Sequence, residues 1–295
     1  IALGKNDLAG FDLREDRREE VTKKYGIITF HDVETALKNF HPDALIISTS
    51  PEHHMQYAWM GFKLGLSCFI EASVVEAGRI LELYNVTKHS TFLIAPSCTM
   101  RYYSGPKKVK ELIGQGVIGQ PLNINYQTGQ YLPDWHPWEN YKYTYTAQKK
   151  MGGGCNLTLS HELDSMYCLF GKIKKVKNFK INKYLRGDVD TSSDFLVEFN
   201  NNIIGYSHID FLGKPHIRKM YISGTKKKVF FNYYKNQIKI VNRSGDTKLI
   251  KVKFKKNDMY LDEIKYFLKC IKNNINPSPS IEESKYILKK FLSIS

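Results

Sequence analysis

The sequence lacks the marks of disulfide-stabilised, zinc-binding and membrane-spanning proteins. Its five cysteines include no CxxC pair and no cysteine with a histidine at zinc-ligand spacing, so we expect neither a disulfide framework nor a metal site. No apolar run approaches the roughly 20 residues of a membrane span, and no signal-peptide pattern is present. These absences predict a chain with no membrane partner that works in the reducing cytoplasm.

Internal repeats and low-complexity stretches are also missing from the sequence. Of the 295 residues, 42% are hydrophobic and 13% are aromatic. This composition excludes a disordered, collagen-like or coiled-coil chain and is sufficient for two hydrophobic cores.

Positive charge, in contrast, is abundant. The chain has 44 lysines and arginines against 29 aspartates and glutamates, which gives a formal net charge of +15. The lysines are spread over many segments, which is typical of a lysine-rich composition of the source genome. The alternative is that the charge attracts an anionic partner. We expect no nucleic-acid partner, because the strand pattern contains no nucleic-acid-binding signature.

Short apolar runs alternate with helical patterns over the first third of the chain. The predicted strands cover residues 8–11, 27–30, 44–47, 68–70 and 92–95, and the predicted helices cover residues 15–25, 31–39, 58–64 and 80–87. This alternation indicates βαβ units around a parallel sheet. We therefore predict an α/β protein in which residues 1–98 form a Rossmann-like domain.

Beyond Arg101 the predicted strands follow one another directly. They cover residues 122–130, 175–184, 193–198, 203–211, 219–223, 229–232, 237–241 and 249–254, with helices at 109–113 and 157–170. Such a run favours an α+β domain with a large, mostly antiparallel sheet over residues 99–258. Helices at 259–271 and 281–292 end the chain, and we expect residues 259–295 to pack back on the two domains.

Asp12 follows the first predicted strand, where a dinucleotide-binding fold places the acid that binds the adenosine ribose. It could equally be a helix-capping acid. Arg14 and its neighbours Arg17 and Arg18 could accommodate a 2′-phosphate, so NAD and NADP both stay open. The glycine-rich turn that stands about 20 residues before such an acid is absent upstream of Asp12, and we expect it to precede Ile1 in a longer chain. The alternative is that the protein has lost this turn and binds no dinucleotide.

Several short segments fall in a recognisable order and spacing. They are Phe11-Asp12, Tyr25-Gly26, residues 42–54, Phe69-Ile70-Glu71, Met100-Arg101-Tyr102 and Gly152-Gly153-Gly154 followed by His161 and Asp164. Together they resemble the glucose-fructose oxidoreductase and inositol dehydrogenase family (Gfo/Idh/MocA) over nearly the whole chain. The run 131–138 (YLPDWHPW) resembles the branch found among bacterial cell-surface sugar pathways.

This resemblance implies hydride transfer between a nicotinamide cofactor, NAD or else NADP, and a carbon of a sugar, sugar phosphate or nucleotide sugar. Thr49 and Ser50 would line the dinucleotide, His54 would lie near the nicotinamide, and Glu71 would close over the cofactor. The implied cofactor-binding residues are Asp12, Arg14, Thr49, Ser50, His54 and Glu71.

The same resemblance implies a substrate site and an oligomer. The implied substrate-binding residues are Arg101, Trp135, His136 and Thr158. His161 and Asp164 would be the catalytic pair, because residues three apart share a helical face. The open face of the sheet would join copies of the chain into dimers or tetramers.

Oxidation of a secondary alcohol requires a base that takes the hydroxyl proton, and an imidazole titrates close enough to neutrality to do so. His161 is the candidate for this base. The alternative is a helix histidine that is satisfied by hydrogen bonds in a crevice. Asp164 could equally pair with a lysine on the surface.

The aromatic loop after residue 130 also has two interpretations. Its side chains, from Trp135 and Trp138 to Tyr141, Tyr143 and Tyr145, could stack on pyranose rings. They could instead pin the loop against the sheet domain.

Two positions depart from the family pattern. The usual Glu-Lys-Pro is here Glu71-Ala72-Ser73, so the lysine that polarises or protonates the substrate oxygen is an alanine, and Thr158 replaces the acid that commonly precedes the histidine. Losing one positioned proton-transfer group costs a factor of about 10² to 10⁴ in rate. The rival hypothesis to an oxidoreductase is therefore a catalytically impaired relative that serves as a binding or assembly protein.

Overall fold

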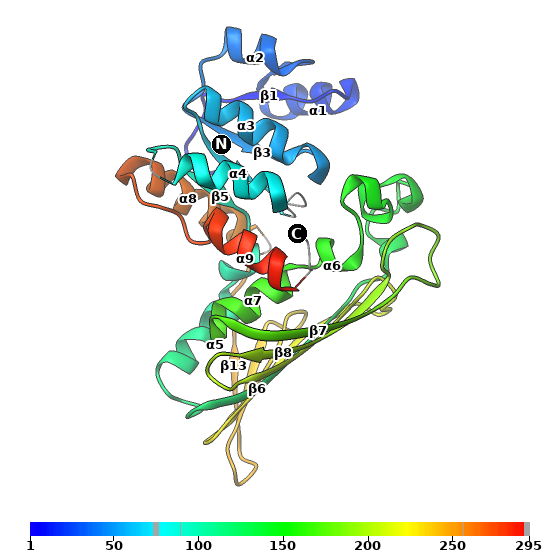
Figure 1. The fold of residues 1–295 in the computed structure, drawn as a ribbon, viewed down its shortest axis with the longest axis vertical. Coiled ribbons are helices and arrows are strands. Elements are labelled where there is room, and N and C mark those ends of the chain that lie inside the picture. The colour runs from blue at the N-terminus through cyan, green and yellow to red at the C-terminus, as the bar shows by residue number, and fades with distance from the viewer. Residues whose placement is uncertain (73–76, 89, 256, 292–295) are drawn as a thin grey trace.

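The computed structural model describes residues 1–72, 77–88, 90–255 and 257–291. Figure 1 shows an N-terminal domain of short strands and helices above a second domain dominated by one long sheet. Two C-terminal helices, α8 (Asp258–Asn273) and α9 (Ile281–Phe291), return to lie beside the N-terminal domain. The helix predicted over 281–292 agrees with α9 as far as residue 291, and residue 292 lies outside the described residues.

Five parallel strands form two sheets in the N-terminal domain. β1 (Ala9–Phe11) pairs with β2 (Ile28–Phe30), and β3 (Ala44–Ile47), β4 (Ser67–Ile70) and β5 (Ile94–Pro96) pair in that order. The helices between them are α1 (Glu15–Tyr25), α2 (Val33–Asn39), α3 (His54–Lys63), preceded by η1 (Pro51–His53), and α4 (Ala77–Thr87). The predicted parallel, Rossmann-like arrangement is confirmed.

Local chemistry sets the ends of these elements. The side chain of Asp32 accepts a hydrogen bond from the Thr35 backbone N–H (2.6 Å) and so caps the start of α2. α1 ends at Gly26, whose φ of 66° only glycine adopts without strain, and whose N–H donates to the Thr22 carbonyl. All four residues of β4 are buried, as expected for a parallel strand covered on both faces.

The second domain holds an eight-stranded sheet. Its strands are β6 (Pro121–Gly129), β7 (Ile173–Ile181), β8 (Ser192–Phe199), β9 (Ile204–Asp210), β10 (Ile217–Gly224), β11 (Lys228–Asn232), β12 (Gln237–Val241) and β13 (Thr247–Lys251). They lie in the order β13-β12-β11-β10-β6-β9-β8-β7, and every neighbouring pair is antiparallel except β6 with β9. The mostly antiparallel sheet predicted from the run of strands is confirmed.

Alternation along the strands gives this sheet one covered and one open face. In β6, Ile124, Tyr126 and Thr128 are buried, whereas the alternate residues Asn123, Asn125 and Gln127 are exposed. α5 (Ser104–Gly114) and α7 (His161–Phe170) lie on the covered side. The core of the second domain therefore lies between these helices and the sheet.

One element differs from the sequence prediction. The helix expected over 157–170 is two helices, α6 (Cys155–Thr158) and α7 (His161–Phe170), because the chain tightens between them. There the Ser160 N–H donates to the Leu157 carbonyl over a long 3.4 Å. The regular helical pattern begins again with the bond from the Asp164 N–H to the Ser160 carbonyl (3.0 Å). The break places His161 in the first turn of a new helix.

The C-terminal helices tie the domains together. Phe267 of α8 packs against Phe69 of β4 with ring centroids 5.8 Å apart. Tyr286 of α9 donates to the Ile173 carbonyl (3.1 Å) and accepts from the Ile173 N–H (2.8 Å) at the start of β7. One end of the chain therefore contacts the sheets of both domains.

Candidate functional site

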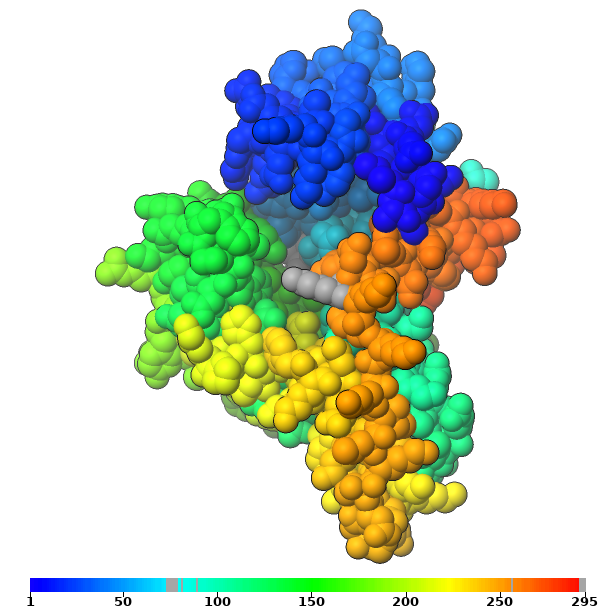
Figure 2. All heavy atoms as spheres, turned by 180° about the vertical axis from the view of Figure 1, so that it is seen from behind, coloured from blue at the N-terminus to red at the C-terminus, as the bar shows by residue number. Residues whose placement is uncertain are grey.

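Polar residues follow each strand of the three-stranded parallel sheet at its carboxyl edge. Glu71 comes directly after β4, and its N–H donates to the Ile47 carbonyl of β3 (2.8 Å). The Ser97 N–H after β5 donates in the same way to the Ile70 carbonyl (2.7 Å). Ligands of open α/β sheets bind at this edge, and Figure 2 shows the surface hollowed there, between the N-terminal domain and the segments coloured green and orange.

Asp12 lies at the corresponding end of β1. Its Oδ1 accepts a hydrogen bond from the Arg14 N–H (2.9 Å), and its side chain is 39% exposed. The guanidinium of Arg14 pairs with Asp16 at 2.5 Å and lies 3.9 Å from Glu139 of the loop that follows β6. The second oxygen of Asp12, Oδ2, lies 4.0 Å from the exposed guanidinium of Arg17, whereas the charge of Arg14 is held by neighbouring acids.

The turn after β3 holds Thr49, Ser50 and His54. His54 is fully buried, and its Nε2 lies 2.9 Å from the Thr49 carbonyl oxygen. Ser50 precedes η1 without capping it through its side chain. His54 thus holds the shape of the turn from inside, while Thr49 and Ser50 stand on the outer side of the turn at the sheet edge.

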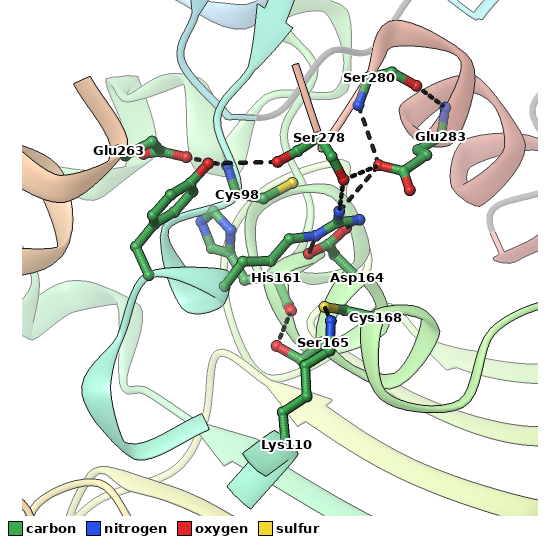
Figure 3. A network of polar contacts seen from close by, with 12 residues as sticks. Cys98, Lys110, His161, Asp164, Ser165, Cys168, Glu263, Ser278, Ser280 and Glu283 are labelled. Carbon is green, nitrogen blue, oxygen red and sulfur yellow. Dashed lines mark hydrogen bonds and ion pairs between the residues drawn. The ribbon is translucent and has the colours of Figure 1, made fainter. Parts of the chain in front are cut away.

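The structure joins two predicted site residues to each other. Arg101 makes a two-pronged ion pair with Asp164 (2.9 and 2.7 Å), and its third nitrogen lies 3.0 Å from Glu283 of α9. Figure 3 shows Asp164, Ser278 and Glu283 converging on this one guanidinium. Burial alone would lower the pKa of Arg101, but the pair with Asp164 raises it above its ordinary value. The pair fixes α7 to the turn after β5 and to α9.

A second buried pair lies beneath His161. Glu162 is fully buried; its Oε1 accepts from the Thr128 hydroxyl (2.8 Å) and lies 2.8 Å from Nε of Arg218 on β10. Burial acts to lower the pKa of Arg218, but Glu162 and the neighbouring tyrosines together raise that pKa above its ordinary value. Sequence reasoning missed this pair, because its members are distant in the sequence.

His161 itself is half-buried at the start of α7. Burial and the nearby charge of Arg218 lower its pKa, against the opposing pull of Glu162, Glu71 and Asp164. The imidazole is therefore neutral at pH 7 and free to accept a proton.

Glu263 of α8 was also missed. It is 3% exposed, and its carboxyl accepts hydrogen bonds from the Cys98 N–H (2.6 Å) and the Ser97 hydroxyl (3.1 Å) at the carboxyl edge of the parallel sheet. Burial raises its pKa to about 8. A glutamate on the apolar face of a predicted helix was the one available signal for this group.

The remaining predicted residues occupy the loop after β6 and the short helix α6. Trp135 packs edge-on against Phe211 at 5.5 Å, and its indole N–H is buried with no hydrogen-bond partner. His136 is exposed beside Trp138, with ring centroids 5.2 Å apart. The Thr158 hydroxyl is buried and unpartnered as well. Among the described residues, two polar groups of the predicted substrate set thus have no protein partner.

The glycine motif before α6 has a steric reason. A Cβ on Gly153 would lie 2.2 Å from the Tyr145 carbonyl oxygen, and Gly154 has a φ of 112°. The loop that includes η3 (Leu132–Asp134), η4 (Tyr141–Tyr143), η5 (Tyr145–Ala147) and η6 (Lys149–Met151) can therefore press directly on the turn that leads to His161. Ala72 stands next to Glu71, and Ser73 lies outside the described residues.

Comparison with known proteins matches this architecture. Residues 107–230 match the model of the GFO/IDH/MocA C-terminal domain. In this part the chain resembles the Gfo/Idh/MocA family. A myo-inositol 2-dehydrogenase of Thermotoga maritima is 24% identical over 94% of this chain and 84% of its own length. An uncharacterised oxidoreductase of Synechocystis sp. is 26% identical over 58% of this chain, and the match spans only 44% of that relative.

The fold of the chain also has solved counterparts. A levoglucosan dehydrogenase solved with NADH and levoglucosan superposes with a TM-score of 0.87 at 16% identity, over 98% of this chain and 87% of the other. In the part of the chain that the structure describes, no helix combines the length and apolarity needed to cross a bilayer.

Proposed function

We propose that this chain is a nicotinamide-dependent oxidoreductase that acts on a CH–OH group of a sugar or a close relative of one. The observation that carries the proposal is the position of His161. His161 begins α7, and the ion pair of Asp164 with Arg101 fastens this helix to the turn after β5, at the edge where a parallel sheet binds dinucleotides. A neutral imidazole there can take the proton of a substrate hydroxyl.

The residues present fit a dinucleotide. The exposed carboxylate of Asp12 can accept a ribose hydroxyl, Thr49 and Ser50 can line the dinucleotide, and Glu71 can close over it. NAD is favoured over NADP, because Asp12 repels a 2′-phosphate and Arg14 is held by Asp16. When bound, the nicotinamide supplies the acceptor for hydride.

The substrate we propose is a sugar, a sugar phosphate or a nucleotide sugar. The unpartnered indole N–H of Trp135 and hydroxyl of Thr158 suit substrate hydroxyls, and exposed His136 can add a further contact. Arg101 and Asp164 act through each other as positioning residues of this site. A place in bacterial surface glycan synthesis follows from the resemblance of the loop 131–138.

Ala72 favours a second candidate function. Because an alanine at this position can neither donate nor accept a proton, a relative that has lost turnover and binds a partner or assembles with one is the alternative.

We also propose a homo-oligomer, a dimer or tetramer, formed through the open face of the eight-stranded sheet. Apolar side chains there are 39 to 68% exposed, which is unusual for a free surface. They are Phe179, Ile181, Leu196, Ile204, Tyr206, Phe230 and Leu249. All five cysteines are free, which suits the reducing cytoplasm we propose as its location.

The test is a nicotinamide absorbance assay of the full-length protein with sugars, sugar phosphates and nucleotide sugars. We expect turnover that His161→Ala lowers about 10²-fold or more, with cofactor affinity unchanged. His41→Ala, an exposed histidine outside the site, is the matched control and should leave turnover unchanged. Complete silence across the panel would favour the binding or assembly function.

A further inference from the structure

Two loops of the second domain border an open hollow that is lined by none of the predicted catalytic, cofactor-binding or substrate-binding residues. Its volume of about 630 Å³ lies within the range of small-molecule binding sites. The loop after β6 contributes Tyr131, Tyr141 and Lys142 to its lining, and the loop between β7 and β8 contributes Tyr184 and Arg186. We call it the tyrosine hollow.

Direct contacts hold the two loops together and give the tyrosine hollow its shape. The Arg186 N–H donates a hydrogen bond to the Tyr141 hydroxyl (3.2 Å). A Cβ on the next residue, Gly187, would lie 2.7 Å from the Ala147 carbonyl oxygen, so only a glycine lets the two backbones approach this closely. The hollow is therefore part of the fold and not a chance gap between independent loops.

Tyr184 exposes its ring in this hollow and has a strained backbone. The residue is 80% exposed, and its φ of 73° lies in the left-handed region that a bulky side chain rarely adopts. A glycine would take this conformation without strain. Because the exposed ring gains little from packing in the protein, packing does not offset the strain. Strained residues of this kind concentrate where proteins hold ligands.

The charge of the tyrosine hollow is positive. Lys142 and Arg186 form no ion pair with any residue that the structure describes, and the described residues that line the hollow include no acid. Two acids of the same loops are engaged elsewhere, since Asp134 pairs with Lys214 (2.7 Å) and Asp188 accepts a backbone hydrogen bond (2.7 Å). Two uncompensated cations beside aromatic rings favour a ligand that combines a ring with an anionic group.

A sugar with an acidic group has both features. Tyrosine rings stack on the apolar faces of sugar rings, and lysine and arginine pair with phosphate or carboxylate. A nucleic acid combines a ring and a charge as well, but the loop after β6 also carries Trp135 and His136 of the proposed sugar site. The position of the hollow on this loop therefore favours a sugar.

We propose that the tyrosine hollow is a second sugar-binding site, which takes a saccharide that carries a phosphate or a carboxylate. The inference rests on the proposed function for its choice of a sugar as the ligand. The tyrosine rings hold the sugar ring, and Lys142 and Arg186 hold its anionic group.

Calorimetric titration of the full-length protein without cofactor tests this site apart from turnover. The probes are maltose 1-phosphate and cellobiouronic acid, with neutral maltose, neutral cellobiose and inorganic phosphate for comparison. We expect at least one acidic disaccharide to bind about tenfold or more tightly than its neutral counterpart, and the preferred one tells phosphate recognition from carboxylate recognition. Inorganic phosphate should bind more weakly than the preferred disaccharide, because it has no ring to stack.

A double variant removes the charges of the hollow. Lys142→Ala with Arg186→Ala should weaken binding of the preferred acidic disaccharide about tenfold and leave binding of its neutral counterpart within twofold. The matched control, Lys23→Ala with Lys272→Ala, removes two exposed lysines of α1 and α8 and should leave both affinities unchanged.

A second variant separates binding from stability. Tyr184→Gly should weaken binding of acidic and neutral disaccharides about fivefold, because it removes a stacking ring. Its thermal unfolding midpoint should not fall, because glycine relieves the strain at this φ. Tyr234→Ala, in the turn between β11 and β12 where this residue is 56% exposed, is the control and should change binding less than twofold.

The outcomes separate this inference from the proposed function. Equal binding of the acidic disaccharide by the parent and by the double variant would overturn the inference, and so would tighter binding of a single-stranded oligothymidylate or of inorganic phosphate than of either acidic disaccharide. A protein that turns over a sugar but binds none of the disaccharides in the hollow keeps the proposed function and loses the inference. Charge-dependent binding in a protein that is silent in the absorbance assay supports the inference and removes the proposed enzyme.

Discussion

Removal of Asp164 should expose the cost of an uncompensated buried charge. The side chains of Arg101 and Asp164 are only 9% and 6% exposed, and two short contacts join them. In Asp164→Ala the guanidinium keeps only one charged partner, Glu283, which is 26% exposed, and a hydrogen bond to the Ser278 hydroxyl (3.3 Å). Breaking one partner out of a buried pair costs about 3 to 5 kcal/mol. We expect a loss of this size in the free energy of unfolding.

Urea unfolding followed by circular dichroism measures this loss. The matched control is Glu111→Ala, which breaks an exposed pair with Lys108 (2.8 Å) on α5 and should cost no more than about 1 kcal/mol. The double variant Arg101→Met with Asp164→Leu removes both charges and should recover most of the stability. A loss below about 1 kcal/mol in Asp164→Ala would refute the reasoning, because it would mean that water or Glu283 already satisfies Arg101.

Three further predictions concern pH, cofactor choice and assembly. Glu263, with its pKa raised to about 8, holds a proton in the folded state that the unfolded chain releases above about pH 5, so the free energy of unfolding should fall between pH 5 and 8. In Glu263→Gln, urea unfolding should show a smaller fall over this pH range. An equal fall in the variant and the parent would contradict this. Asp12→Ser should narrow the preference for NAD over NADP about tenfold in calorimetric titration, whereas an unchanged ratio would remove Asp12 from ribose recognition. Leu196→Glu, on the open sheet face where this side chain is 49% exposed, should shift the protein to smaller species in sedimentation, and an unchanged distribution would argue against that interface.

Local sequence patterns predicted the helices and strands well where neighbouring residues determine them. Alternation and capping located α1 and β3 with the observed bounds, and the strands of both domains with small shifts at their ends. They failed at Leu159 and Ser160, where the break between α6 and α7 depends on packing against the glycine turn and leaves no periodic mark.

The candidate site was less predictable, because its contacts join distant parts of the chain. Arg101 and Asp164 were each assigned to ligand chemistry, yet the structure pairs them across 63 positions. Glu263 meets Cys98 across 165 positions, through a helix that returns from the other end of the chain. A sequence shows that a charged group exists, but which charges neutralise one another is decided only when the fold brings them together.

The paired charges also determine which groups can move a proton. Arg101 and Arg218 have raised pKa values and partners that hold them, so both stay charged throughout the neutral range. His161 has a lowered pKa, and Glu263 has a pKa of about 8, so neither group is fixed in its charged form at pH 7. A rate that depends on a neutral imidazole should therefore rise as pH increases through the lowered pKa of His161. A second inflection near pH 8 would come from Glu263, which bonds the Ser97 hydroxyl and the Cys98 N–H at the sheet edge, so Glu263→Gln separates the two.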